Sequence, residues 1–177
     1  FARSEQLINP QDLHSALYKN LSHTSNVDFL TYTQAVLSSE DNLAQLIVDG
    51  SKVTADQILI ADGSWASEML RDLPLRPVKG QYLLLKGQEL ISRPIRTPDV
   101  YIVPRENGLY YLGATMEEEG FSLSHTAGAA LDLLYHAWQV FRGIYELELI
   151  HYGVGLRPAL RDNLPAIGNY KYSNLHL

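Results

Sequence analysis

The sequence of 177 residues contains no cysteine. This absence excludes disulfide bonds, thiolate zinc sites, iron–sulfur clusters and a cysteine nucleophile. It fits a reducing compartment, and we expect a cytoplasmic protein. No apolar run approaches the roughly 20 residues of a membrane-spanning helix, so no membrane span is predicted. The formal net charge is −6 and there is no long basic run, which argues against nucleic acid as a partner.

Several signatures of catalytic sites are also missing. Gly153 and Gly155 provide the first two glycines of a dinucleotide-binding fingerprint, but the third is absent and Pro158 is incompatible with the helix that should follow. The histidines show no metal-binding spacing, and no serine lies in a nucleophile elbow. The sequence therefore predicts no phosphate cradle, no metal site and no catalytic side chain. Because the chain begins at Phe1 rather than at methionine, we expect it to be part of a longer protein.

Two helices are predicted from capping residues and apolar spacing. Asn9 followed by Pro10 is typical of a helix start, and leucines at helical spacing extend the prediction over residues 10–22. Thr126 begins the second helix, which ends at Gly143. Its predicted apolar stripe consists of Ala127, Ala130, Leu131, Leu134, Ala137, Trp138 and Phe141.

A β-hairpin is predicted where Asn107-Gly108 joins two stretches rich in aromatic and β-branched residues. With these two residues as the loop, Val103 would face Leu112 and Tyr101 would face Ala114. One face of the hairpin would then carry Tyr101, Val103, Leu112, Ala114 and Met116. We interpret this face as one wall of a small-molecule pocket; the alternative is an ordinary hairpin with a half-buried core face. The acidic turn Glu117–Gly120 that follows is expected to be solvated.

Two further places are candidate binding sites. Arg157 precedes Pro158, which favours an extended backbone, and a guanidinium held there suits bidentate capture of a carboxylate. The alternative is a surface arginine paired with Asp162 or Glu148. Gly63 follows the apolar run 57–61, which we interpret as a strand buried on both faces, and would let the backbone approach a cofactor. Trp65 could pack over that cofactor or belong to the core.

Four groups of motifs in this order resemble the FAD-dependent D-amino-acid oxidase family, and within it the glycine oxidase branch associated with the thiazole of thiamin. They are Ala61-Asp62-Gly63-Ser64-Trp65; Pro77-Val78-Lys79-Gly80-Gln81; Tyr101-Ile102-Val103-Pro104-Arg105 with Gly113-Ala114-Thr115-Met116; and Gly155-Leu156-Arg157-Pro158 with Leu164-Pro165-Ala166-Ile167-Gly168. The resemblance extends over the chain from about residue 8.

The resemblance implies an α+β fold: a substrate domain with a large, mostly antiparallel sheet and helices, and part of a Rossmann-like FAD-binding domain. Residues 1–72 would belong to the FAD domain and residues 73–155 to the substrate domain, with residues 156–177 returning toward the FAD domain. The substrate would be bound by Arg157, Tyr101 and Met116. The cofactor FAD would be contacted by Val36, Gly63 and Trp65.

The implied reaction is oxidation of a small amino acid, such as glycine, sarcosine or a D-amino acid, to the imine. A flavin supplies this chemistry without a side-chain base, and oxygen is the expected acceptor. A homo-oligomer is a possible assembly. Two departures support an alternative, a non-catalytic remnant that acts as a binding or oligomerisation module. The glycine-rich loop is absent, and Asp62 would repel a pyrophosphate. We expect the isolated fragment to be inactive.

Overall fold

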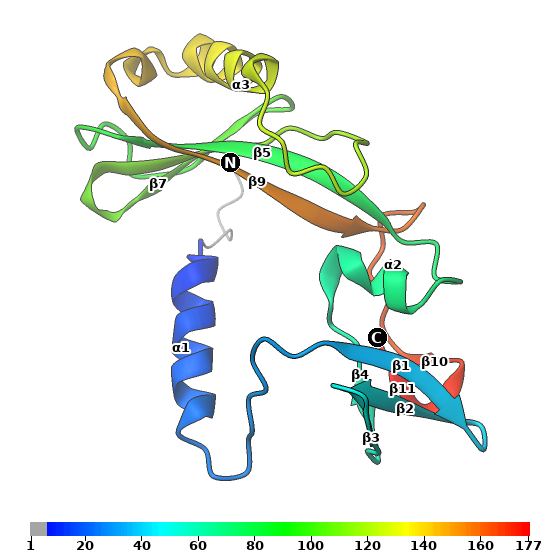
Figure 1. Ribbon diagram of the computed structural model, residues 1–177. Coiled ribbons are helices and arrows are strands. Elements are labelled where there is room, and N and C mark those ends of the chain that lie inside the picture. The colour runs from blue at the N-terminus through cyan, green and yellow to red at the C-terminus, as the bar shows by residue number, and fades with distance from the viewer. Residues whose placement is uncertain (1–6) are drawn as a thin grey trace.

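The larger part of the molecule is an antiparallel sheet covered on one face by a helix (Figure 1). The computed structural model describes residues 7–177. The sheet has the strand order β6-β7-β8-β5-β9. Its strands are β5 (Arg76–Lys86), β6 (Ile95–Arg96), β7 (Tyr101–Arg105), β8 (Leu109–Gly113) and β9 (Glu148–Ala159). The two longest strands, β5 and the edge strand β9, are paired from Arg76 opposite Ala159 to Lys86 opposite Glu148, with one register shift between Leu84 and Leu85.

The core of this part lies between the sheet and helix α3 (Ala127–Val140). Leu83 and Leu85 of β5 pack with Ile102 of β7 and Leu112 of β8, and the helix contributes Leu133 and Ala137. Side chains alternate along a strand, so the neighbours of these residues point to the opposite face of the sheet. That face is partly exposed and is the one that carries Tyr101 and Arg157.

The smaller part contains two three-stranded sheets and short helices. One sheet is formed by β1 (Ala35–Glu40), β2 (Leu43–Val48) and β3 (Ser51–Val53). The other has the order β10-β11-β4, with β4 (Ile58–Leu59), β10 (Asn169–Tyr170) and β11 (Tyr172–His176). The C-terminal strand β11 runs parallel to β4, so the end of the chain joins the N-terminal segment (Figure 1). A short helical turn η1 (Gly63–Trp65) and α2 (Ala66–Met69) follow β4.

Both predicted helices are present, but the second ends at Val140 rather than at the predicted Gly143. α1 spans Pro10–Ser22, and the Asn9 side chain accepts a hydrogen bond from the backbone N–H of Gln11. None of the α1 residues is buried, so its apolar stripe is not packed by the rest of residues 7–177. The Thr126 side chain caps α3 by accepting from the N–H of Ala129. The α3 face that is buried differs from the predicted stripe, because Leu131 is 68% exposed.

The hairpin is present, but its predicted register is wrong by one residue. The loop has three residues, Glu106–Gly108, and Arg105 faces Leu109. Asn107 and Gly108 do adopt positive φ angles, 60° and 67°. The consequence is that Leu112 faces Ile102, and both are fully buried under α3. Leu112 therefore does not share a face with Tyr101; Tyr111 and Gly113 do.

Two other predictions about local structure are wrong. The strand at 57–61 is confined to Ile58–Leu59, and Leu59 is 67% exposed, so it is not buried on both faces. The prediction of a solvated acidic turn is wrong at Glu117, whose side chain is 24% exposed and forms an ion pair with the buried Lys79, whereas Glu118–Gly120 are exposed as expected. Among residues 7–177, no helix combines the length and apolar character needed to cross a bilayer.

The corrected register makes a testable prediction about stability. We expect Leu112→Ala to lower the free energy of unfolding by about 2–5 kcal/mol, because it leaves a cavity beneath α3. Leu131→Ala, on the exposed side of α3, should change it by less than about 0.5 kcal/mol. Urea denaturation followed by circular dichroism measures both. Equal effects of the two variants would contradict the observed register.

Candidate active site

Tyrosines and glycines alternate across the sheet on the face away from α3. In one row, Tyr101 faces Gly113, Gly113 faces Tyr82, and Tyr82 faces Gly153. Each glycine makes room for a ring that lies over it. A Cβ atom added at Gly113 would come within 2.6 Å of the Tyr101 hydroxyl, and one at Gly153 within 2.2 Å of the Tyr82 ring. The glycines therefore allow the rings to lie close to the backbone.

A third tyrosine completes an aromatic surface, which together with Arg157 we call the tyrosine face. The Tyr111 ring stacks on that of Tyr82 at a centroid distance of 4.5 Å and lies parallel to that of Tyr101 at 6.0 Å. Burial, followed by the nearby Tyr101 and Tyr82 hydroxyls, raises the pKa of Tyr111 well above its ordinary value. The Tyr111 hydroxyl is therefore protonated and uncharged at neutral pH.

Arg157 projects from β9 onto the same face. Its guanidinium lies over Gly80 of β5, where an added Cβ would be 2.5 Å from Nη1. Nη1 donates a hydrogen bond to the carbonyl oxygen of Thr115 over 3.0 Å. This bond uses one of the five N–H donors of the guanidinium. The side chain is exposed to solvent, so a bound anion could reach it.

The Arg157 guanidinium and the Tyr101 hydroxyl lie over the same face of the sheet. They lie over Gly80 and Gly113, and Gly113 is paired with Tyr82, two residues from Gly80. Such diagonal neighbours in an antiparallel pair are about 7–8 Å apart. Two hydrogen bonds of about 2.8 Å to the two oxygens of one carboxylate would span this gap. The spacing of the two glycines is therefore close to the span of one carboxylate with a hydrogen bond at each oxygen.

The other predicted substrate residue is placed differently. Met116 lies beyond the end of β8 and is 77% exposed, and Leu112, predicted to lie beside it, is in the core. The described residues also contain no group of three histidine, aspartate or glutamate side chains arranged to hold a metal ion. Of the predicted substrate residues, Arg157 and Tyr101 are thus the two with a polar group on the tyrosine face.

The predicted cofactor residues lie in the smaller part of the molecule. Gly63 has a φ of 59°, and a Cβ added there would meet no atom within 4 Å. With Asp62 it lines a cleft of about 420 Å³, whose opposite wall includes Leu164–Ala166. Trp65 is 45% exposed and packs against Phe121, so it is not a core tryptophan. Val36 lies on β1, 54% exposed, opposite Ile47.

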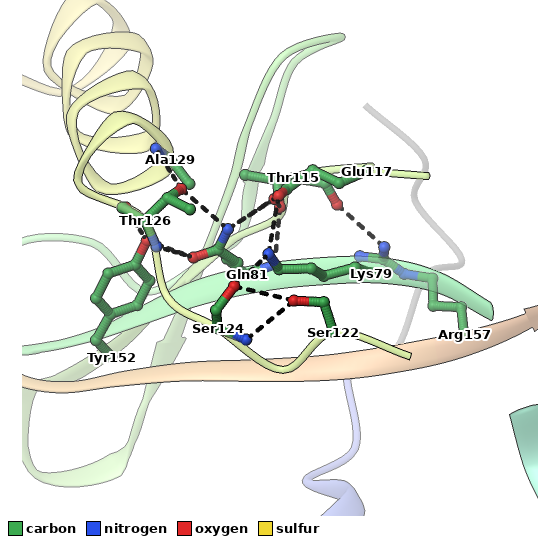
Figure 2. Close-up of polar contacts among 10 residues, drawn as sticks. All are labelled: Lys79, Gln81, Thr115, Glu117, Ser122, Ser124, Thr126, Ala129, Tyr152 and Arg157. Carbon is green, nitrogen blue, oxygen red and sulfur yellow. Dashed lines mark hydrogen bonds and ion pairs between the residues drawn. The ribbon is translucent and has the colours of Figure 1, made fainter. Parts of the chain in front are cut away.

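A buried polar cluster was missed from the sequence. Lys79 and Gln81 are fully buried beneath the segment that leads into α3, and both contact Glu117 (Figure 2). A signal was available: Lys79 lies an even number of residues from Leu83 and Leu85 and so shares their core-facing side of the strand, and a buried lysine requires a partner. The run of glutamates after the hairpin supplies one.

Comparison with known proteins gives a consistent result. The family described as "FAD dependent oxidoreductase" (DAO) matches residues 1–177. Glycine oxidase of Pseudomonas aeruginosa is 28% identical over 167 residues, which cover 90% of this chain and 46% of that protein. The bifunctional protein ThiO/ThiG of Nostoc sp. is 30% identical over 81% of this chain and 23% of its own length. The crystal structure of glycine oxidase from Geobacillus kaustophilus superimposes with a TM-score of 0.77 at 26% identity, over 83% of this chain and 42% of that one.

The chain therefore spans less than half the length of these relatives. The α+β architecture with antiparallel sheets agrees with the structural neighbour and confirms the predicted fold class. The match over the whole chain shows the family directly. The chain belongs to the FAD-dependent oxidoreductase (DAO) family.

Proposed function

We propose that the intact protein oxidises a small amino acid, such as glycine, sarcosine or a D-amino acid, to its imine with oxygen as the acceptor. The observation that carries this proposal is the placement of the Arg157 guanidinium and the Tyr101 hydroxyl over neighbouring glycines on one face of the sheet. The names of the relatives, which include glycine oxidases, support the same substrate class.

In this proposal the residues of the chain bind and orient the substrate. Arg157 forms a charge-assisted hydrogen bond with one carboxylate oxygen, and the Tyr101 hydroxyl donates to the other. The stacked rings of Tyr82 and Tyr111 form an aromatic surface beside this anchor. Bound FAD would supply the hydride acceptor for the α-carbon. A substrate anchored by its carboxylate presents its α-carbon in one orientation.

The cleft beside Gly63 has features that suit part of the cofactor. The open space at Gly63 allows close approach of a ligand to the backbone. The Ser64 hydroxyl is buried and has no hydrogen-bond partner within residues 7–177, which is unusual for a buried polar group. Asp62 would repel a pyrophosphate, so we propose that Gly63 contacts an uncharged part of FAD in this cleft. Ser64, Val36 and Trp65 do not line the cleft, and we propose Val36 and Trp65 as contacts outside it.

An absorbance spectrum of the purified intact protein tests the proposal. We expect flavin bands that bleach when glycine, sarcosine or D-alanine is added without oxygen, and hydrogen peroxide production in air. A folded but colourless protein would contradict it. That outcome would favour the second candidate, a non-catalytic binding or oligomerisation module. The observation that favours this candidate is Asp62 in the wall of the cleft, because its carboxylate would repel the pyrophosphate of FAD.

A further inference from the structure

An ion pair lies on the side of β5 that faces α3, opposite the side over which Arg157 extends. We call this the covered side of the sheet. Lys79 is 0% exposed, and its Nζ lies 3.3 Å from Oε2 of Glu117 and 3.4 Å from Oγ of Ser124. Gln81 is equally buried, and its Nε2 donates to both carboxylate oxygens of Glu117, over 2.8 and 3.1 Å. Figure 2 shows these groups gathered along β5 beneath the segment leading to α3.

Glu117 is held by its backbone as well as by its side chain. Its N–H and carbonyl exchange hydrogen bonds of 3.0 and 2.9 Å with the backbone of Lys79. Burial acts to raise the pKa of Glu117, but hydrogen bonds from Thr115 and Gln81 and the charge of Lys79 lower it overall. The carboxylate is therefore charged at neutral pH and bound from several sides.

Thr115 connects this ion pair with the tyrosine face. Its hydroxyl donates to Glu117 and accepts from the N–H of Gln81 over 2.8 Å. Its own N–H donates to the carbonyl of Gln81 over 3.2 Å. Its carbonyl is the group that accepts the hydrogen bond from Arg157 (Figure 2). The position of that carbonyl is thus set by the backbone pairing of Thr115 with Gln81 and by the contact of its hydroxyl with Glu117.

We propose that Glu117, with its buried counter-ion Lys79, is a positioning residue for Arg157 and acts through Thr115. This inference rests on the proposed function of Arg157 as the carboxylate anchor. The arginine side chain has several rotatable bonds and is exposed, so a fixed acceptor is needed to keep its guanidinium over Gly80. A rigid neighbouring group that holds a binding side chain reduces the cost of ordering it.

Glu117→Gln in the intact, FAD-loaded enzyme tests the inference, because the amide keeps the shape but loses the charge. We expect the KM for glycine or sarcosine to rise about three- to tenfold, the value of one hydrogen bond. The kcat should stay within about twofold, since the carboxylate anchor acts equally in ground and transition states. Glu118→Gln is the matched control: Glu118 is 64% exposed and pairs with Arg76 instead. An unchanged KM in Glu117→Gln would overturn the inference.

A double-mutant cycle separates positioning from a general structural role. If Glu117 acts through Arg157, then Glu117→Gln in the Arg157→Ala background adds nothing further to KM. Independent, multiplying effects on KM would overturn the inference even if each single variant is impaired. Loss of thermal stability alone, with an unchanged KM, would identify the ion pair as merely structural.

A second variant and a structural readout cover the remaining outcomes. Should Glu117→Gln fail to fold, Thr115→Val removes the connecting hydroxyl without removing the partner of Lys79, and it should raise KM in the same direction. A crystal structure of the folded variant should show the guanidinium displaced from Gly80; an unmoved guanidinium overturns the inference. If the wild-type protein does not oxidise amino acids, the proposed function fails, and the crystal structure still tests whether Glu117 positions Arg157.

Discussion

Arg157→Ala is expected to raise the KM for a small α-amino acid by at least about tenfold in the intact enzyme, because it removes a charged hydrogen-bond donor to the substrate carboxylate. The kcat at saturating substrate should fall much less, since the lost contact stabilises the bound substrate and the transition state alike. Steady-state peroxide production at varied glycine or sarcosine concentration measures both constants.

Two further variants sharpen this prediction. Arg157→Lys keeps the charge but loses the planar fork, so it should recover only part of the affinity. Arg161→Ala removes an exposed arginine four residues away and should leave KM within about twofold. If the Arg157→Ala enzyme has the KM of the wild type, Arg157 does not bind the substrate and the proposed site is wrong.

Gly80→Ala is expected to disturb the site without removing any of its functional groups. The added methyl group would lie 2.5–2.7 Å from the guanidinium atoms of Arg157. Those atoms are the end of a flexible side chain, so the guanidinium can move away and the fold should persist. We expect the KM for the amino acid to rise about tenfold or more, approaching the effect of Arg157→Ala.

The chain offers a matched control for this variant. Gly155 is paired with Gly80 across β5 and β9, and a methyl group added there would meet no atom within 4 Å. Gly155→Ala adds a methyl group on the adjacent strand β9 but leaves the Arg157 guanidinium in place. The KM of the Gly155→Ala enzyme for the amino acid should therefore stay well below that of the Gly80→Ala enzyme. Similar KM values for the two variants would show that displacement of the guanidinium is not the cause.

The location of the hairpin was predictable, but its register was not. Asn107-Gly108 marks the turn because both residues adopt positive φ. The same dipeptide fits a loop of two or of three residues, and these choices differ by one position in register. Burial of Ile102 and Leu112 against α3 decides for the three-residue loop. A contact with a helix that begins after residue 120 cannot be read from the hairpin sequence itself.

The candidate site, too, was predictable from the sequence only in part. Motif resemblance identified Tyr101 and Arg157 as substrate-binding candidates, and this assignment remains a prediction. The alternation of tyrosine and glycine across the sheet was not visible, because its members come from four strands far apart in the sequence. Glu117 was expected to be solvated because its neighbours are charged; its partial burial follows from the pairing of its backbone with Lys79.

The sequence by itself determined the helix starts, the position of the turn and the family resemblance, because caps, φ preferences and ordered motifs are local properties of the chain. Only the tertiary structure decided which residues face α3, which glycines lie beneath the aromatic rings and the guanidinium, and which carboxylate neutralises Lys79. Those features depend on the register between distant strands, and that register is chosen by the core that the whole sheet buries against α3.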